Sequence, residues 1–286
     1  MTRWMITGAG GMLGSELAGL LRLNGTPVAA LSRRDLDVTD TRAVRAAVAR
    51  HRPDVIVNCA AWTDFHGAEG REPEVLRING TAVAGLAAVC ADAAVRLIQI
   101  STSYVFDGTA RCPYAEDAQA VPISVYGRTK LTGEQAAAAL AEAGQAAIVR
   151  TAWLYGRHGT NFVAMMAELE RTRQTVEAVA DGWGQPTWTA DVARQIVAIA
   201  DSGAAGVFHA TSGGGTSRYG QTRELFRLLG ADPARVKPVG RDRFPGPARR
   251  PTYSVLGHEG WKRAGLAPIP DWREALAVAF PRLGLA

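Results

Sequence analysis

The sequence predicts an α/β protein built on a doubly wound parallel sheet, with a smaller C-terminal lobe. Two observations predict this fold class. Short β-branched runs alternate with amphipathic helical segments through the first half of the chain, which is typical of right-handed crossovers between parallel strands. A glycine-rich turn directly follows the first run, at the strand end where such sheets bind ligands.

The elements of the first half follow from their apolar patterns. Short runs rich in Val, Ile and Leu are typical of strands buried on both faces. The expected strands cover residues 4–7, 28–32, 55–58, 97–102 and 147–151. Segments with apolar residues at helical spacing are expected to cover the sheet as helices, over residues 13–23, 41–50, 82–93 and 129–143.

The pattern loosens after residue 156. Helices are expected over residues 161–171, 189–200, 218–229 and 271–280, and a short strand over 207–210. The segment 233–251 is rich in proline and arginine and has no regular pattern. We therefore predict a large domain over residues 1–156 and a smaller lobe mainly over 157–286, with some of its segments returning to the large domain.

Composition and charge exclude several classes of protein. With 47% hydrophobic and 21% charged residues, the chain is expected to be globular rather than disordered. Cys59, Cys90 and Cys112 are too few and too scattered for a disulfide framework, which favours a reducing compartment. The net charge is +5, but no basic run indicates nucleic-acid binding. No signal peptide or membrane span is visible, so we expect a cytoplasmic protein without membrane contact.

The turn after the first expected strand is a candidate phosphate-binding site. Gly8, Gly11 and Gly14 have the spacing of a dinucleotide-binding turn, in which glycines permit a tight bend and close approach of backbone to phosphate. The position between a strand and a helix supports this interpretation over an ordinary glycine turn. The large domain is therefore predicted to be Rossmann-like and to bind a dinucleotide.

The end of the second strand indicates which dinucleotide is preferred. An enzyme selective for NAD usually places an acid there, whereas this chain has Arg33 and Arg34 after Ser32. Guanidinium groups pair well with a 2′-phosphate, so NADPH is predicted, with NADH possible. The alternative is that both arginines are merely solvated. Asp37 and Val38 are expected against the adenine.

A tyrosine and a lysine form the candidate catalytic pair. Tyr126 and Lys130 are four residues apart, hence on one face of a helix. The chain has few lysines and tyrosines, and chance would produce this spacing roughly 0.06 times. A nearby ammonium is expected to lower the pKa of the phenol and make it a proton donor near neutral pH. Ser101 and Thr102 end the fourth strand, and a hydroxyl there is expected to bond a substrate carbonyl.

These motifs carry a resemblance to a known family. The glycine turn, the hydroxyl strand end and Tyr-x-x-x-Lys are similar to the extended short-chain dehydrogenase/reductase superfamily. Longer strings resemble the dTDP-4-dehydrorhamnose reductase family more closely, over nearly the whole chain. These strings are NCAAWT (58–63), STSYVFDG (101–108), SVYGRTK (124–130), RTAWLYG (150–156) and GQPT (184–187).

The resemblance implies reduction of the 4-keto group of a dTDP-activated 4-keto-6-deoxyhexose by NAD(P)H. Tyr126 would donate the proton, Lys130 would lower its pKa and hold the nicotinamide ribose, and Thr102 would orient the carbonyl. Further implied cofactor positions are Met12, Leu13, Asp37, Val38, Cys59, Ala60, Ala61, Trp62 and Thr63. Implied substrate positions are Thr102, Ser103, Val105, Phe106, Tyr126, Trp153, Asn161, Trp183 and Gln185.

The chain departs from the family pattern at two positions. Ser103 stands where the family usually has an aspartate, and His66 stands where an acid is common. These changes leave open whether the sugar serves rhamnose supply or a secondary metabolite. Some relatives bind magnesium through glutamates at a dimer contact. Glu16 matches one of these positions but Ala190 occupies another, so no metal is predicted, and the chain is expected to be a monomer or a homodimer.

Alternatives remain for the protein and for its basic residues. A related branch of the family regulates methionine adenosyltransferase without catalysis, and the change at Ser103 motivates that reading. Epimerisation or dehydration would need additional acids or bases that the sequence does not supply. The arginine-rich C-terminal segment is either a solvated basic face or a contact for the nucleotide diphosphate, and its cations are Arg235, Lys237, Arg241, Arg243, Arg249 and Arg250.

Overall fold

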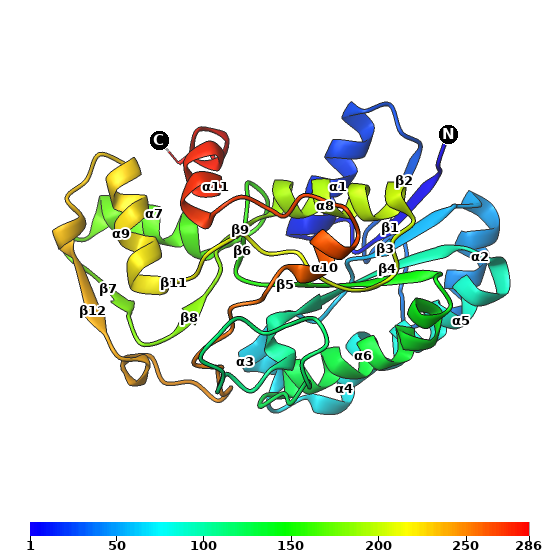
Figure 1. The fold of residues 1–286 in the computed structure, drawn as a ribbon, viewed down its shortest axis with the longest axis horizontal. Helices are drawn as coiled ribbons and strands as arrows, with labels where there is room; N and C mark the ends of the chain where they lie inside the picture. The colour runs from blue at the N-terminus through cyan, green and yellow to red at the C-terminus, as the bar shows by residue number, and fades with distance from the viewer. Residues whose placement is uncertain (286) are drawn as a thin grey trace.

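A six-stranded parallel sheet forms the centre of the molecule (Figure 1). The computed structural model describes residues 1–285. The strand order is β10-β5-β4-β3-β1-β2, and every neighbouring pair is parallel. The strands are β1 (Trp4–Thr7), β2 (Val28–Leu31), β3 (Val55–Asn58), β4 (Arg96–Thr102), β5 (Ala146–Thr151) and β10 (Gly206–His209). The predicted doubly wound parallel sheet is confirmed, because helices cover both faces.

Each face of the sheet has its own hydrophobic core. On one face α1 (Met12–Leu23) packs against α8 (Thr189–Ser202), and Leu17 and Ile196 are fully buried with Ile6 of β1. On the other face lie α2 (Thr41–His51), α5 (Ala82–Ala93) and α6 (Val125–Glu142), which bury Met5 and Ile56. Alternate residues of β1 therefore pack into opposite cores, which explains why the strand is buried along its whole length.

One long helical run is longer than the sequence pattern predicts. It joins α4 (Glu72–Leu76), the π-helical turn η1 (Arg77–Thr81) and α5 without a break. The sequence does not predict the helix over Glu72–Thr81, because Pro73 and Gly80 are poor helix residues in general. Pro73 is nevertheless tolerated, because it lies in the first turn of the helix. The run Glu72–Ala93 is long and apolar enough to cross a membrane by composition, but half of it is buried here, against α2 and α6.

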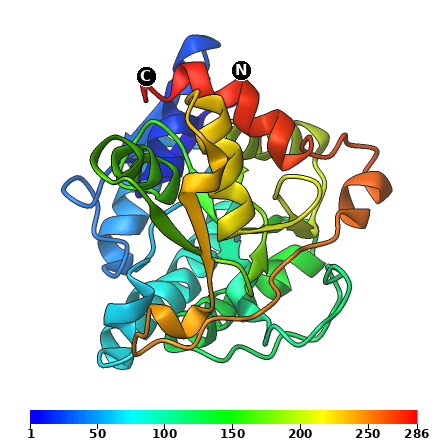
Figure 2. The ribbon, with the colours of Figure 1, turned by 90° about the vertical axis from the view of Figure 1, so that its left-hand side faces the viewer.

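The smaller lobe has its own core of helices and short strands (Figure 2). The parallel pair β7 (Val176–Val179) and β12 (Val236–Val239) packs with α7 (Phe162–Thr172), α9 (Arg218–Leu228) and α11 (Trp272–Ala279). Phe226 and Trp272 are fully buried in this core. In contrast, α8, β10 and α10 (Glu259–Arg263) lie with the large sheet, although they belong to the second half of the chain.

The remaining elements are short. Two strand pairs link the lobes, β6 (Leu154–Tyr155) with β9 (Thr187–Trp188) and β8 (Trp183–Gly184) with β11 (Thr216–Ser217). Two residues are too few to produce a periodic pattern, so the sequence does not predict these strands. The other helical turns are α3 (Phe65–Ala68), η2 (Ser103–Val105), η3 (Pro233–Arg235), η4 (Arg241–Arg243) and η5 (Phe280–Arg282).

Helix α6 begins at Val125, before the predicted start at residue 129. Ser124 caps it by accepting a hydrogen bond from the Gly127 amide at 3.2 Å. A buried ion pair then holds the helix against β5, since Arg150 Nη2 lies 2.7 Å from Glu134 Oε2. Arg150 Nη1 also donates to the carbonyl of Glu116 at 3.1 Å. The cap and the ion pair together fix the helix that carries Tyr126 and Lys130.

We expect Glu134→Ala to lower the free energy of unfolding by about 3 kcal/mol, because it leaves the buried Arg150 guanidinium without its counter-charge. The matched control is Asp92→Ala, which removes the acid of an exposed helix-surface pair with Arg45 and should cost less than about 1 kcal/mol. Urea unfolding of both variants gives the comparison. Equal losses would show that the buried pair does not anchor α6.

Candidate active site

The turn between β1 and α1 forms a glycine cradle. Gly8 has φ +65°, and a Cβ there would lie 2.6 Å from the Ala60 amide nitrogen. A Cβ on Gly14 would lie 2.5 Å from the Gly8 carbonyl oxygen. Gly11 is the N-cap of α1 and supplies no side-chain acceptor, so the first amides of the helix face the space in front of the turn. Helix amides in this arrangement bind phosphate.

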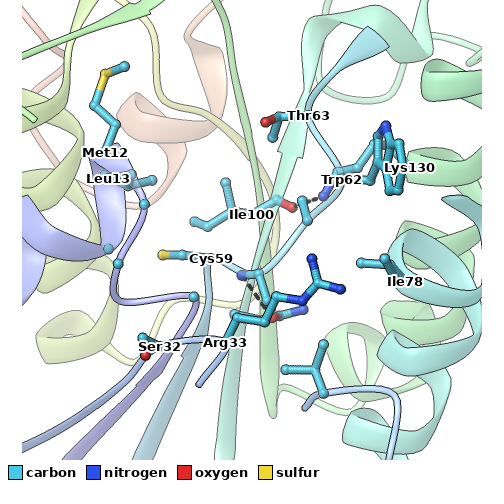
Figure 3. A pocket seen from close by; sticks show the side chains of 18 of the residues that line it. Met12, Leu13, Ser32, Arg33, Cys59, Trp62, Thr63, Ile78, Ile100 and Lys130 are labelled. Carbon is cyan, nitrogen blue, oxygen red and sulfur yellow. Dashed lines mark hydrogen bonds between the residues drawn. The ribbon is translucent and has the colours of Figure 1, made fainter. Parts of the chain in front are cut away.

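A cavity of about 930 Å³ opens in front of this cradle (Figure 3). All residues expected to bind the cofactor line it, and they come from the ends of β1, β2 and β3 and from α6. They are Gly8, Gly11, Met12, Leu13, Gly14, Arg33, Arg34, Asp37, Val38, Cys59, Ala60, Ala61, Trp62, Thr63, Tyr126 and Lys130. The structure brings these residues together, and their individual contacts with a cofactor stay predictions.

Two buried hydroxyl groups support a polar ligand in this cavity. Ser101 Oγ and Thr151 Oγ1 lie at the ends of β4 and β5 and line the cavity. Both are buried, and neither has a hydrogen-bond partner among the residues that the structure describes. Buried polar atoms are normally satisfied. The two hydroxyls and the glycine cradle therefore fit a ligand that carries phosphates and hydroxyl groups, such as a dinucleotide.

The candidate catalytic side chains lie in and beside the same cavity. Tyr126 is in the first turn of α6, and Lys130 follows one turn later. The Lys130 ammonium donates to the Ile100 carbonyl oxygen at 2.6 Å, a bond visible in Figure 3. Thr102 ends β4, and its hydroxyl acts on the Tyr126 phenol, whose pKa it lowers. The phenol, the ammonium and the hydroxyl thus come from two neighbouring elements at the carboxyl edge of the sheet.

The pKa values of Tyr126 and Lys130 differ from those that the sequence predicts. Burial raises the pKa of Tyr126 to about 12, with the hydrogen bond from Thr102 opposing the rise. Burial also lowers the pKa of Lys130 to about 8, although Glu134 and Cys59 oppose this. The expected lowering of the tyrosine pKa by Lys130 is wrong for the protein alone, because the ammonium bonds to backbone and burial dominates both groups. The phenol is therefore protonated at neutral pH and can act as a proton donor.

Asn79 supports the cavity wall and was not predicted. It lies on the π-helical turn η1. Its Oδ1 accepts from the Trp62 amide at 2.8 Å, and its Nδ2 donates to the Trp62 carbonyl at 3.1 Å. Nδ2 also donates to Thr129 Oγ1 on α6 at 3.3 Å. Asn79 thereby fixes the loop after β3 relative to α6, a long-range role that leaves no local signal in the sequence.

Two of the expected substrate residues are core residues. Val105 and Phe106 are fully buried. The Phe106 ring stacks on Tyr114 with centroids 4.1 Å apart and also faces the Arg150 guanidinium. The prediction that these two side chains contact substrate is wrong, because they have no exposed surface. Ser103 is also buried, its Oγ has no hydrogen-bond partner among the described residues, and it lines neither of the two cavities.

Three other expected substrate residues lie in two places: Asn161 at the start of α7, and Trp183 and Gln185 at a second cavity. Asn161 caps α7, with Oδ1 accepting from the Ala164 amide at 3.1 Å. Gln185 is buried, and its amide bonds to both backbone groups of Leu256. Trp183 is 46% exposed and, with Gln185, lines a second cavity of about 860 Å³. The structure therefore does not bring Trp183 and Gln185 into the cavity that contains Tyr126.

Arg218 is an unpredicted residue beside Trp153. It is the first residue of α9, and its guanidinium lies 3.8 Å from the Trp153 ring centroid. Burial lowers the pKa of Arg218 to about 9. Its side chain bonds to Gln221, and no carboxylate pairs with it among the described residues. A cation in the first turn of a helix opposes the helix dipole, and this unusual position is the signal that could have marked it in the sequence.

A second guanidinium, that of Arg250, lies near the first. It bonds His66 Nε2 at 2.7 Å and covers the Phe65 ring at 4.9 Å. The charges of Arg218 and Arg250 both act on Tyr104, which contacts the Tyr126 ring edge-on with centroids 6.0 Å apart. His66, singled out in the sequence, therefore lies next to a cation near the catalytic tyrosine.

The rest of the basic C-terminal segment is mostly paired. Arg235 pairs with Glu170, Arg241 with Asp181 and Arg243 with Glu177. These contacts hold the segment on the small lobe, so the hypothesis of a purely solvated basic face is too simple. Among residues 1–285, no group of three potential metal ligands lies close together.

Comparison with known proteins identifies the family of this chain. The model of a family described as "RmlD substrate binding domain" matches residues 2–284. This chain belongs to the dTDP-4-dehydrorhamnose reductase family. A Streptomyces niveus protein named dTDP-4-keto-6-deoxy-D-glucose reductase is 57% identical over 281 residues, which are 98% of this chain and 97% of the relative. A dTDP-4-dehydrorhamnose reductase of Streptomyces griseus is 50% identical over 98% of this chain and 94% of its own.

Solved structures of the family agree in fold. The Clostridium acetobutylicum dTDP-4-dehydrorhamnose reductase has a TM-score of 0.94 and 38% identity, over 98% of this chain and 99% of its own. The Bacillus anthracis enzyme, solved in complex with NADP, has a TM-score of 0.94 and 32% identity over the same shares. The predicted family and the Rossmann-type fold are thus confirmed.

We expect Gly14→Ala to weaken NADP⁺ binding at least about tenfold, because the added Cβ overlaps the backbone of Gly8 and distorts the cradle. Gly19→Ala is the matched control on the same helix. No atom lies within 4 Å of its added Cβ, so it should leave binding unchanged and stabilise α1 by up to about 1 kcal/mol. Calorimetric titration and thermal unfolding measure both effects. Normal binding by the Gly14 variant would contradict the assignment of the cradle.

Proposed function

We propose that this protein reduces the 4-keto group of a dTDP-4-keto-6-deoxyhexose, with NADPH as the preferred reductant. The observation that carries the proposal is the position of Tyr126 and Lys130 in the cavity that begins at the glycine cradle. The names of the relatives support the substrate class, and the NADP complex of the Bacillus anthracis enzyme supports the cofactor. Arg33 and Arg34 at the cavity wall favour NADPH over NADH.

Within this proposal the protein supplies the proton and the alignment. The bound reduced nicotinamide supplies the hydride that the carbonyl carbon accepts. Tyr126 donates its phenolic proton to the carbonyl oxygen, so the ketone becomes an alcohol and the phenol a phenolate. Thr102 favours release of this proton, because its hydroxyl lowers the pKa of the phenol, and Lys130 in the same cavity would hold the nicotinamide ribose. Proton return from solvent restores the tyrosine.

Arg218 and Arg250 support a substrate that carries a diphosphate. Arg218 is partly buried without a carboxylate partner among the described residues, and the polar contact of Arg250 is the His66 ring. Guanidinium groups bind phosphate oxygens in a forked geometry. A nucleotide diphosphate at these two residues would leave the sugar beside Tyr104 and Tyr126. The relatives named above act on different deoxysugars, so the proposal extends to the class of sugar only.

The proposed setting follows from the same features. We infer that the enzyme works in the cytoplasm, away from membranes and nucleic acid, as a monomer or a homodimer. The free thiols of Cys59, Cys90 and Cys112 are consistent with a reducing compartment. A regulatory subunit of a methionine adenosyltransferase is disfavoured because Thr102, Tyr126 and Lys130 occur together. Absence of turnover together with capture of a synthetase partner would revive that alternative.

We expect Tyr126→Phe to lower kcat at least about 100-fold, because the ring stays but the proton donor is lost. Calorimetric binding of NADP⁺ should remain within about twofold, since the hydroxyl is not needed for the phosphate contacts. Tyr219→Phe, in the small-lobe core, is the control and should leave both quantities unchanged. Oxidation of NADPH with a dTDP-4-keto-6-deoxysugar gives the rate. Full activity of the Tyr126 variant would disprove the proposed proton transfer.

The pH dependence should report Lys130. Its pKa of about 8 means that the ammonium is present below this pH and is lost above it, so the cavity loses the cation that would hold the nicotinamide ribose. We therefore expect kcat/KM for NADPH, which reflects the free enzyme, to fall as pH rises through about 8. Tyr126, with its pKa of about 12, stays protonated over this range.

The test of this assignment is Lys130→Met, compared with Lys262→Met, which affects only a surface pair with Glu259. The Lys130 variant should be slow and should show no fall near pH 8, whereas the control should keep the wild-type profile. An unchanged alkaline fall in the Lys130 variant would assign the titration to another group.

A further inference from the structure

Arginine side chains lie on both walls of the cavity at the end remote from Tyr126. Arg33 and Arg34 follow β2, and Arg77 lies on η1 at the opposite wall. All three line the 930 Å³ cavity. Figure 3 shows Arg33 reaching across the cavity toward Ile78, which is the next residue after Arg77. Arginine side chains therefore line the cavity from η1 as well as from the loop after β2, where the sequence predicts them.

Arg77 is held at this place by the opposite wall. Its Nη1 donates to Thr39 Oγ1 at 3.3 Å. Thr39 is fixed in turn by Asp37, whose Oδ1 accepts from the Thr39 amide at 2.9 Å and from its hydroxyl at 2.8 Å. Among the described residues no carboxylate forms an ion pair with Arg77. The bond to Thr39 is the only hydrogen bond of its guanidinium among the described residues, so most of its donors are available to a ligand in the cavity.

The backbone of η1 gives Arg77 a defined position. The turn is π-helical, a wider turn that is frequent at functional sites. Two residues further on, Asn79 binds both backbone groups of Trp62, so the turn is fastened to the loop after β3. An arginine on a fastened turn loses less conformational entropy when it binds an anion than one on a free loop.

The acids near these arginines are already engaged. Asp37 accepts both Thr39 bonds, and these bonds together with the charges of Arg77 and Arg33 hold its pKa below the usual range. Asp35 turns back to Ser32, whose amide and hydroxyl it accepts at 2.9 and 2.6 Å. Asp35 does not line the cavity. Asp37 does line the cavity, but its Oδ1 is engaged by Thr39 and its charge is offset by Arg33 and Arg77, unlike the isolated acid after the second strand that NAD selectivity requires.

We propose that Arg77 is a specificity-determining residue that binds the 2′-phosphate of NADPH together with Arg33 and Arg34, across the mouth of the cavity. This inference rests on the proposed function for the presence of a dinucleotide, and adds a determinant from a different element of the fold. The 2′-phosphate is a dianion near neutral pH, and guanidinium groups on both sides match its oxygens. NADH has a hydroxyl at this position and gains nothing from Arg77.

The test is calorimetric binding by Arg77→Gln, with no turnover involved. The probes are NADP⁺ and NAD⁺, and also 2′,5′-ADP and 5′-AMP, which carry only the adenosine end. We expect Kd for NADP⁺ and for 2′,5′-ADP to rise about tenfold, while Kd for NAD⁺ and 5′-AMP stays within about twofold. Arg33→Gln should act in the same direction. Arg42→Gln is the matched control, an exposed arginine in the first turn of α2 that does not line the cavity.

Salt provides an independent readout. Raising the ionic strength should weaken NADP⁺ binding to the wild type more than NAD⁺ binding, and Arg77→Gln should reduce that difference. Thermal unfolding of the free variants shows whether the substitution disturbs the fold. Equal weakening of NADP⁺ and NAD⁺ by Arg77→Gln, or no weakening of either, would overturn the role of Arg77. Failure of the wild type to bind any of the four probes would instead refute the proposed function.

Discussion

Close contact between two backbone segments shapes the whole site. The turn after β1 lies directly against the turn after β3, and a single Cβ at Gly8 would collide with Ala60. This contact leaves room for the cavity and directs the amides of α1 into it. The cavity at this edge of the sheet thus depends on the absence of a side chain at one position, and α6 is placed relative to it by β4 and β5.

Much of the fold is predictable because strands buried on both faces are short, continuous apolar runs. The strands at 4–7 and 55–58 have the predicted bounds. Prediction is poorer where local signals conflict with tertiary packing. Glu72–Thr81 is helical despite Pro73 and Gly80, and α6 starts early because Ser124 caps it. The two-residue strands between the lobes exist only through their partners.

The candidate site likewise contains residues that the sequence predicts and residues that it does not. Its cofactor residues follow strand ends, so their convergence is expected from topology. Arg77, Asn79 and Arg218 come from helices, and only long-range packing brings them to the cavity or to the catalytic tyrosine. Phe106 is misassigned because membership of a sequence string does not say which side of the backbone a residue faces. Burial also sets the charges of Tyr126 and Lys130 in ways that helical spacing alone does not reveal.

The return of late segments to the large sheet has a consequence for the architecture. Strand β10 pairs with β5, and α8 covers the apolar face of α1. A polypeptide ending at residue 156 would leave the β5 edge unpaired and Leu17 facing water. The large domain therefore depends on segments from the second half of the chain, and truncation at residue 156 should yield an aggregating fragment rather than an autonomous binding domain.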